Sequence, residues 1–125
     1  MKKELTTFFL LFAIMRLWAY DYTENNVNYI ISDGEVIIST SPNATGDLVI
    51  PHEIVINNHT YTVKEIQSSA FTGCSGLKSV TIENDGVRTI GSTAFSGCRY
   101  LKSVTISNSV ENIGYSCLIT VFRVH

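Results

Sequence analysis

The chain repeats its own sequence at an interval of 24 residues. The segment 63–82 returns as 87–106 with most of its apolar positions in place, and a third copy runs from Val110 to about Leu118 at an offset of 23. A period of this length is typical of a solenoid, in which each repeat forms one coil that packs only on its neighbours. The sequence therefore predicts a stack of coils that presents a surface, not a domain closed around a pocket.

Within the first repeat, each apolar position can be given a place. Val80 and Ile82 alternate with Thr81, so we expect a strand that directs the first two side chains into the core and Thr81 outward. Successive strands should then stack in parallel, about 4.8 Å apart. Opposite the strand, Ser69-Ala70-Phe71 suits a short helical or 3₁₀ turn that directs its phenylalanine inward. Gly73-Cys74 then turns the chain back toward the strand.

The outward side chains of the two repeat strands are the candidate binding residues. They are hydroxyl residues with one glutamate, and rows of small hydroxyl groups suit broad, adaptable hydrogen bonding. The six are Ser79, Thr81, Glu83, Ser103, Thr105 and Ser107. Behind them, Ile66 and Ile90 are expected to fill the remaining corner of the core.

Residues 20–62 lack the repeat and are expected to be rich in strands. Asp33-Gly34 separates the apolar runs 27–31 and 36–38, which is a strong signal for a hairpin. A second hairpin is expected around 57–59. Because a stack of repeats exposes an apolar end and an unpaired strand edge, we interpret this segment as an N-terminal cap. The alternative is an independent small β domain, for which about 43 residues is marginal.

The two ends of the chain carry different signals. Residues 1–19 resemble a secretory signal: Lys2 and Lys3 precede an apolar run of about a dozen residues, with cleavage expected after Ala19. The run is shorter than the ~20 residues that span a bilayer, so we expect no stable membrane span after cleavage. Residues 119–125 do not continue the repeat, so they form a divergent tail.

The charge that remains after cleavage excludes one class of partner. Six of the nine Lys and Arg and ten of the eleven Asp and Glu would remain, a net charge near −4 without a basic stripe. Nucleic acid needs clustered Lys and Arg for its phosphates, so it is not an expected partner.

The repeats resemble the BspA-type leucine-rich repeats, which occur in secreted and surface proteins of anaerobic Gram-negative bacteria and of some protozoan parasites. The resemblance covers about residues 46–118. It is carried by Ile90-Gly91, Ala94-Phe95, Cys98, Leu101, Val104, Ile106 and Val110. It implies a β-rich α/β solenoid, a short leucine-rich repeat stack of parallel strands with helical or 3₁₀ turns after a β-hairpin cap. The expected units are 1–19 signal peptide, 20–62 cap, 63–86, 87–109 and partial 110–118 repeats, and 119–125 tail.

The cysteine and histidine residues do not predict a metal site, a cofactor or an enzyme. Cys74 and Cys98 occupy the same repeat position, and their spacing fits no C-x-x-C zinc pattern. We interpret them as buried apolar residues, and a Cys74–Cys98 disulfide is the alternative in an exported protein. His52 and His59 have no acid–base partner in the sequence, so only an unexpected cleft around them would favour an enzyme.

Two hypotheses for function follow. The first is an exported, non-enzymatic module, secreted or held at the cell surface. The resemblance implies that such a module binds host or neighbouring-cell surface proteins or glycans. The second is a truncated remnant of a larger surface protein with no binding function of its own, because two complete repeats are few for a stable stack.

Overall fold

The computed structural model describes residues 20–116 of the chain. In this range the protein consists of ten strands joined by turns, and it contains no helix. The strands are β1 (Tyr22–Glu24), β2 (Val27–Ser32), β3 (Glu35–Ile38), β4 (Gly46–Ile50), β5 (Glu53–Ile56), β6 (His59–Ile66), β7 (Leu77–Ile82), β8 (Thr89–Ile90), β9 (Ser103–Thr105) and β10 (Asn112–Ile113).

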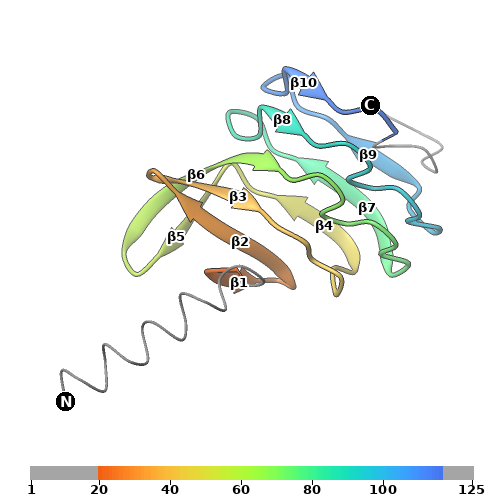
Figure 1. The fold of residues 1–125 in the computed structure, drawn as a ribbon, viewed down its shortest axis with the longest axis horizontal. Coiled ribbons are helices and arrows are strands. Elements are labelled where there is room, and N and C mark those ends of the chain that lie inside the picture. Colours follow the sequence, from red (N-terminus) through yellow and green to blue (C-terminus); the bar gives the residue numbers. More distant parts are fainter. Residues whose placement is uncertain (1–19, 117–125) are drawn as a thin grey trace, which may run out of the picture.

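The strands form two sheets that face each other across the core (Figure 1). Sheet A has seven strands in the order β1-β2-β3-β6-β8-β10, with β5 also paired to β6. Sheet B has three strands in the order β4-β7-β9. The chain passes from sheet A through a set of turns to sheet B and back again, so each circuit is one coil of a solenoid.

Consecutive coils pair in parallel in both sheets. In sheet B, β7 pairs with β4 on one side and β9 on the other, and Thr81 lies in register with Thr105. The predicted parallel stacking of the repeat strands is therefore confirmed. In sheet A, β6, β8 and β10 also pair in parallel, with Ile66, Ile90 and Ile113 in register. Ile66 and Ile90 thus belong to a second parallel sheet, where the sequence predicted only a corner of the core.

Parallel pairing begins before the repeat becomes visible in the sequence. β3 pairs in parallel with β6, and β4 pairs in parallel with β7. Both strands lie within residues 20–62, so this segment supplies a coil of its own before the first recognisable repeat. Whether the segment ends the stack as a cap stays a prediction.

Both predicted hairpins are confirmed. β2 and β3 are antiparallel around Asp33-Gly34, and β5 and β6 are antiparallel around Asn57-Asn58. The two central residues of each turn have positive φ, from 49° to 77°, as a type I′ turn requires. A third hairpin joins β1 to β2 through Asn25-Asn26, which have the same left-handed backbone.

The turns opposite sheet B are not helical. Ala70 N donates to Gln67 O over 3.2 Å, but Ser69 has φ +62° and so leaves the right-handed helical region. Gly73 has φ +74° in the next turn, where glycine carries no steric cost. The predicted helical or 3₁₀ geometry is therefore not confirmed in residues 20–116, because left-handed residues interrupt the segment every four positions.

The core lies between the sheets and the turns. Phe71 and Phe95 project inward as predicted, and their rings stack with centroids 5.3 Å apart and planes 6° apart. Around this stack, coils contribute matched apolar side chains that are almost fully buried. These include Ile38, Ile66, Ile90, Ala70, Ala94, Leu77, Leu101, Val80 and Val104.

We expect Phe95→Ala to lower the free energy of unfolding by about 3–5 kcal/mol, because it removes a buried ring and leaves a cavity beside Phe71. The measurement is urea unfolding followed by circular dichroism. Tyr100→Ala, an exposed aromatic residue in the same coil, is the matched control and should change stability by less than about 0.5 kcal/mol. Equal losses in the two variants would contradict the central place of the phenylalanine stack.

Candidate functional site

The outward face of sheet B forms two rows that cross its three strands. One row contains Asp47, Ser79 and Ser103, and the next contains Val49, Thr81 and Thr105. The outward orientation predicted for the serines and threonines of these rows is confirmed, since Thr81 and Thr105 are exposed and Ser79 and Ser103 are half-buried.

Two residues of these rows were not predicted from the sequence. Asp47 accepts a hydrogen bond from the Ser79 hydroxyl over 2.8 Å, and Val49 is 54 % exposed beside Thr81. The alternation of Leu48 and Ile50 with these two residues is the signal that could have identified β4 as a neighbour of β7. The face is thus three strands wide, about 10 Å from first to last strand at ~4.8 Å spacing.

One predicted outward residue is wrong. Ser107 is only 9 % exposed, because the chain turns inward after β9. Its hydroxyl lies 2.7 Å from the Ser109 hydroxyl, and Ser109 donates to Val87 O over 2.9 Å. Ser107 therefore holds a turn together and does not face a partner.

Glu83 lies at the end of β7 and is bound by His52. One carboxylate oxygen of Glu83 accepts from the His52 backbone N–H over 2.9 Å and lies 3.0 Å from the ring Nδ1. The hydrogen bond to Glu83 raises the pKa of His52, with smaller contributions from the charges of Glu53, Glu83 and Asp85. The same hydrogen bond lowers the pKa of Glu83. We name this pair the His52–Glu83 clasp; it ties the start of the β5–β6 hairpin to sheet B.

We expect Glu83→Gln to bring the pKa of His52 back toward its ordinary value, as measured by NMR titration of the imidazole. The raised histidine pKa stabilises the fold below about pH 6.5, and this contribution is lost as pH rises through the folded value. The lowered Glu83 pKa stabilises the fold above about pH 4.5 and is lost as pH falls through its folded value. The difference in melting temperature between native and variant should therefore be largest between these two pH values. A His52 pKa that does not respond to Glu83→Gln would contradict the clasp.

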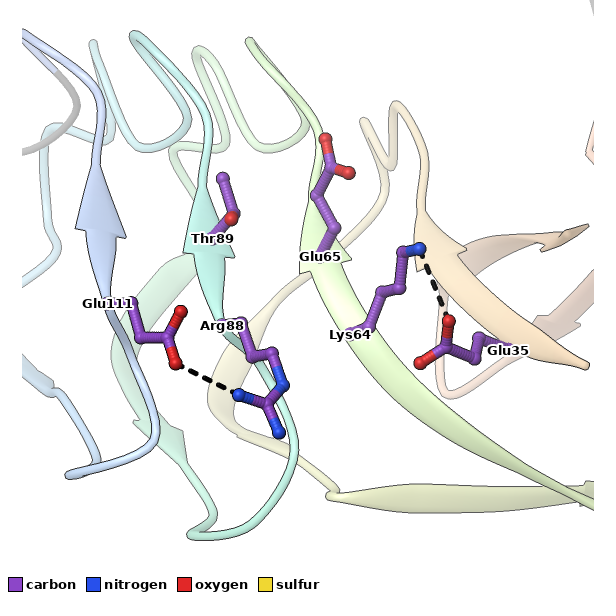
Figure 2. A pocket seen from close by; sticks show the side chains of 6 residues that line it. All are labelled: Glu35, Lys64, Glu65, Arg88, Thr89 and Glu111. Carbon is purple, nitrogen blue, oxygen red and sulfur yellow. Dashed lines mark hydrogen bonds and ion pairs between the residues drawn. The ribbon is translucent and has the colours of Figure 1, made fainter. Parts of the chain in front are cut away.

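Sheet A carries a shallow hollow of about 350 Å³ on its outer face (Figure 2). Lys64 reaches Glu35 over 3.2 Å, and Arg88 reaches Glu111 over 2.9 Å. All the side chains that line it are polar: Glu35, Lys64, Glu65, Arg88, Thr89 and Glu111. Small-molecule sites have mostly apolar walls, so this open hollow with polar walls does not fit one.

The charged hollow was also missed in the sequence. Lys64, Arg88 and Glu111 occupy one repeat position: Arg88 N donates to Lys64 O and Glu111 N donates to Arg88 O, each over 2.8 Å. The signal in the sequence was the charged residue that follows Val63, Val87 and Val110 in each repeat. Had these segments been predicted as a second strand in each repeat, the alternation of inward and outward positions would have revealed the row of charges.

Cys74 and Cys98 are buried free thiols, as the favoured interpretation predicted. The Cys74 Sγ donates to Ser41 O over 3.2 Å, and the Cys98 Sγ donates to Phe71 O over 3.0 Å. Each thiol therefore bonds to the carbonyl of the preceding coil. Burial raises the pKa of both thiols, to about 11 for Cys98.

We expect a Cys117→Ser variant, whose two remaining thiols are Cys74 and Cys98, to be inert to Ellman's reagent at pH 8 while folded. Burial and the raised pKa both keep the thiolate from forming. In guanidinium chloride without reductant, two thiols should react. Two thiols reacting in the folded protein would contradict this burial, and none reacting in denaturant would indicate the Cys74–Cys98 disulfide instead.

Neither a metal centre nor a catalytic group emerges from the described part of the chain. Residues 20–116 contain no group of three or more His, Cys, Asp or Glu that could hold a metal ion. His52 and His59 lie at opposite ends of the β5–β6 hairpin, since Val63 N donates to His52 O whereas His59 pairs with Ile56. Within the same range, no helix has the length and apolar character needed to cross a bilayer.

Comparison with known proteins now decides the family. The sequence model described as the BspA type leucine rich repeat region (6 copies) matches residues 52–122, more than half of the chain. The chain belongs to this family. No match was found among curated proteins.

Several solved structures of bacterial leucine-rich repeat proteins are similar to this fold. A leucine rich cell surface protein from Faecalibacterium prausnitzii is 26 % identical, with a TM-score of 0.66, over 82 % of this chain and 32 % of its own. The leucine rich repeat protein of T. pallidum is 22 % identical, with a TM-score of 0.67, over 84 % and 49 %. One from Bacteroides ovatus is 22 % identical, with a TM-score of 0.59, over 83 % and 34 %. The BspA-type chain thus spans between 32 % and 49 % of the length of these three proteins.

Proposed function

We propose that this BspA-type chain is an exported, non-enzymatic recognition module of a bacterial surface, and that it binds its partner through the outward face of sheet B. Leucine-rich repeat proteins are binding modules, and the F. prausnitzii relative is a cell surface protein. Adhesion to host or neighbouring-cell proteins is the role that this combination supports best.

The observation that carries the proposal is the contrast between the two sheets. On sheet A, four of the five charged side chains of the hollow form two ion pairs, Lys64–Glu35 and Arg88–Glu111. On sheet B, the exposed hydroxyl groups of Thr81 and Thr105 make no hydrogen bond to any residue between 20 and 116. These groups remain available to a partner, and backbone hydrogen bonds to β4 and β9 hold β7 rigid behind them.

The size of this face limits the strength of binding. A standard interface buries about 800 Å² on each partner, and three short strands supply only part of that area. We therefore expect weak binding that gains strength when several copies act together or when neighbouring surfaces contribute.

The test uses the full chain and surface plasmon resonance against immobilised extracellular-matrix proteins and host-cell membranes. Thr81→Arg/Thr105→Arg should lower the affinity at least tenfold, because two long side chains would cover the rows. Thr60→Arg/Thr62→Arg makes the same change at exposed positions of β6 and should bind as the native chain does. Equal binding by the native chain and the Thr81→Arg/Thr105→Arg variant, with both folded by circular dichroism, would refute this face.

A further inference from the structure

The cationic side chains are unevenly distributed over the two sheets. On sheet A, Lys64 and Arg88 are neutralised by the glutamates of the charged hollow. The other cations between residues 20 and 116 form no ion pair with that part of the chain. They are Lys78, Arg99 and Lys102, and all three are exposed.

The fold gathers these three cations at one corner. Lys78 and Lys102 hold the same position in consecutive coils, and Lys102 N donates to Lys78 O over 2.8 Å. Arg99 and Tyr100 form the turn that leads into β9, beside the turn that leads into β7 (Figure 1). We name Lys78, Arg99, Tyr100 and Lys102 the basic corner.

Tyr100 is an exposed aromatic residue within this corner. Its side chain is 64 % exposed, although large aromatic side chains are usually more buried. The same repeat position in the preceding coil is Gly76, where a Cβ would lie only 2.7 Å from Thr45 Oγ1. The coil beneath Tyr100 therefore places no side chain at the matching position, and the ring lies open to solvent in the turn that also contains Arg99.

The opposite end of sheet B is acidic. Glu83 follows β7, and its neighbour His52 also experiences the charges of Glu53 and Asp85. Along the strand direction the face changes from the basic corner to the row of Asp47, Ser79 and Ser103, where the Asp47 carboxylate accepts from the Ser79 hydroxyl. The row of Val49, Thr81 and Thr105 follows, and Glu83 and its neighbouring carboxylates lie beyond it.

We infer that the basic corner binds a short acidic segment of the partner protein, and that the partner then continues over the hydroxyl rows of sheet B. Three unpaired cations complement a cluster of carboxylates, and Tyr and Arg are enriched at the centres of protein interfaces. A long polyanion laid along the strands would meet the carboxylates at their far end, so a nucleic acid or a sulfated glycan fits less well. This inference rests on the proposed function and assigns the chemistry of its partner.

The test measures fluorescence anisotropy of a labelled peptide of eight glutamates with the full chain. The native chain should bind it, and more weakly at 200 mM than at 50 mM NaCl, because exposed charges are screened. Arg99→Gln/Lys102→Gln should lower the affinity about threefold to tenfold, as expected for two exposed charge contacts. Lys64→Gln/Arg88→Gln removes the same formal charge from sheet A and is the matched control, which should bind as the native chain does. Tyr100→Ala should also weaken binding without changing the charge.

Three results would overturn the inference. They are no binding of the glutamate peptide, equal losses in the two double variants, and tighter binding of heparin than of the peptide at 200 mM NaCl. The proposed function is tested separately, by binding of the Thr81→Arg/Thr105→Arg variant to host surfaces. This variant blocks the rows of sheet B but adds positive charge near the basic corner, so the two experiments respond to it differently. Loss of host-surface binding in that variant, with the glutamate peptide unbound by the native chain, would refute only the basic corner.

Discussion

The coils of the two complete repeats are held together by backbone hydrogen bonds at three places around their circumference. In sheet A, Gly91 N donates to Ile66 O over 2.8 Å, and in sheet B, Lys102 N donates to Lys78 O over the same distance. On the turn side, Phe71 N donates to the next coil, again over 2.8 Å. Residues at one repeat position must therefore lie beside one another. The phenylalanine stack, the thiol-to-carbonyl bonds, the charged hollow and the basic corner all follow from this register.

Much of the register was predictable from the repeat, because a fixed offset of 24 residues directly pairs Ser79 with Ser103 and Phe71 with Phe95. Inward and outward positions of the sheet B strands followed from their alternation. The second parallel sheet was not predicted, because β8 and β10 are only two residues long and too short to show a period. The pairing of Lys64 with Glu35 joins two segments with different local sequence, so no repeat pattern could reveal it.

The outward threonines of sheet B and the charged residues differ in how far the sequence predicts their role. Outward threonines are visible as alternation, but the role of a charge depends on whether the fold supplies it with a partner. Arg88 and Arg99 look alike in the sequence. Both are exposed, but the fold places Glu111 beside Arg88 and gives Arg99 no ion pair within residues 20–116. Only the structure therefore separates charges that pair between coils from charges that do not.

Within residues 20–116, coils differ in length at two corners. On the path from sheet A to sheet B, the stretch from Ile38 to Gly46 is three residues shorter than the paired stretch from Ile66 to Leu77. The second corner leads from sheet B back to sheet A. The path from Ile82 to Thr89 contains one residue more than the equivalent path from Ile106 to Asn112, and Asp85 accommodates it with φ +68° while both sheets keep register. At the same corner of the first coil, between β4 and the second half of β6, the chain inserts the whole turn of the β5–β6 hairpin. This corner accommodates differences in chain length, while the paired strands on either side keep their register. Together with the shorter turn between β3 and β4, the insertion explains why the first coil does not show the constant period. The corner also marks where the stack can accept additional residues without losing its strand pairing.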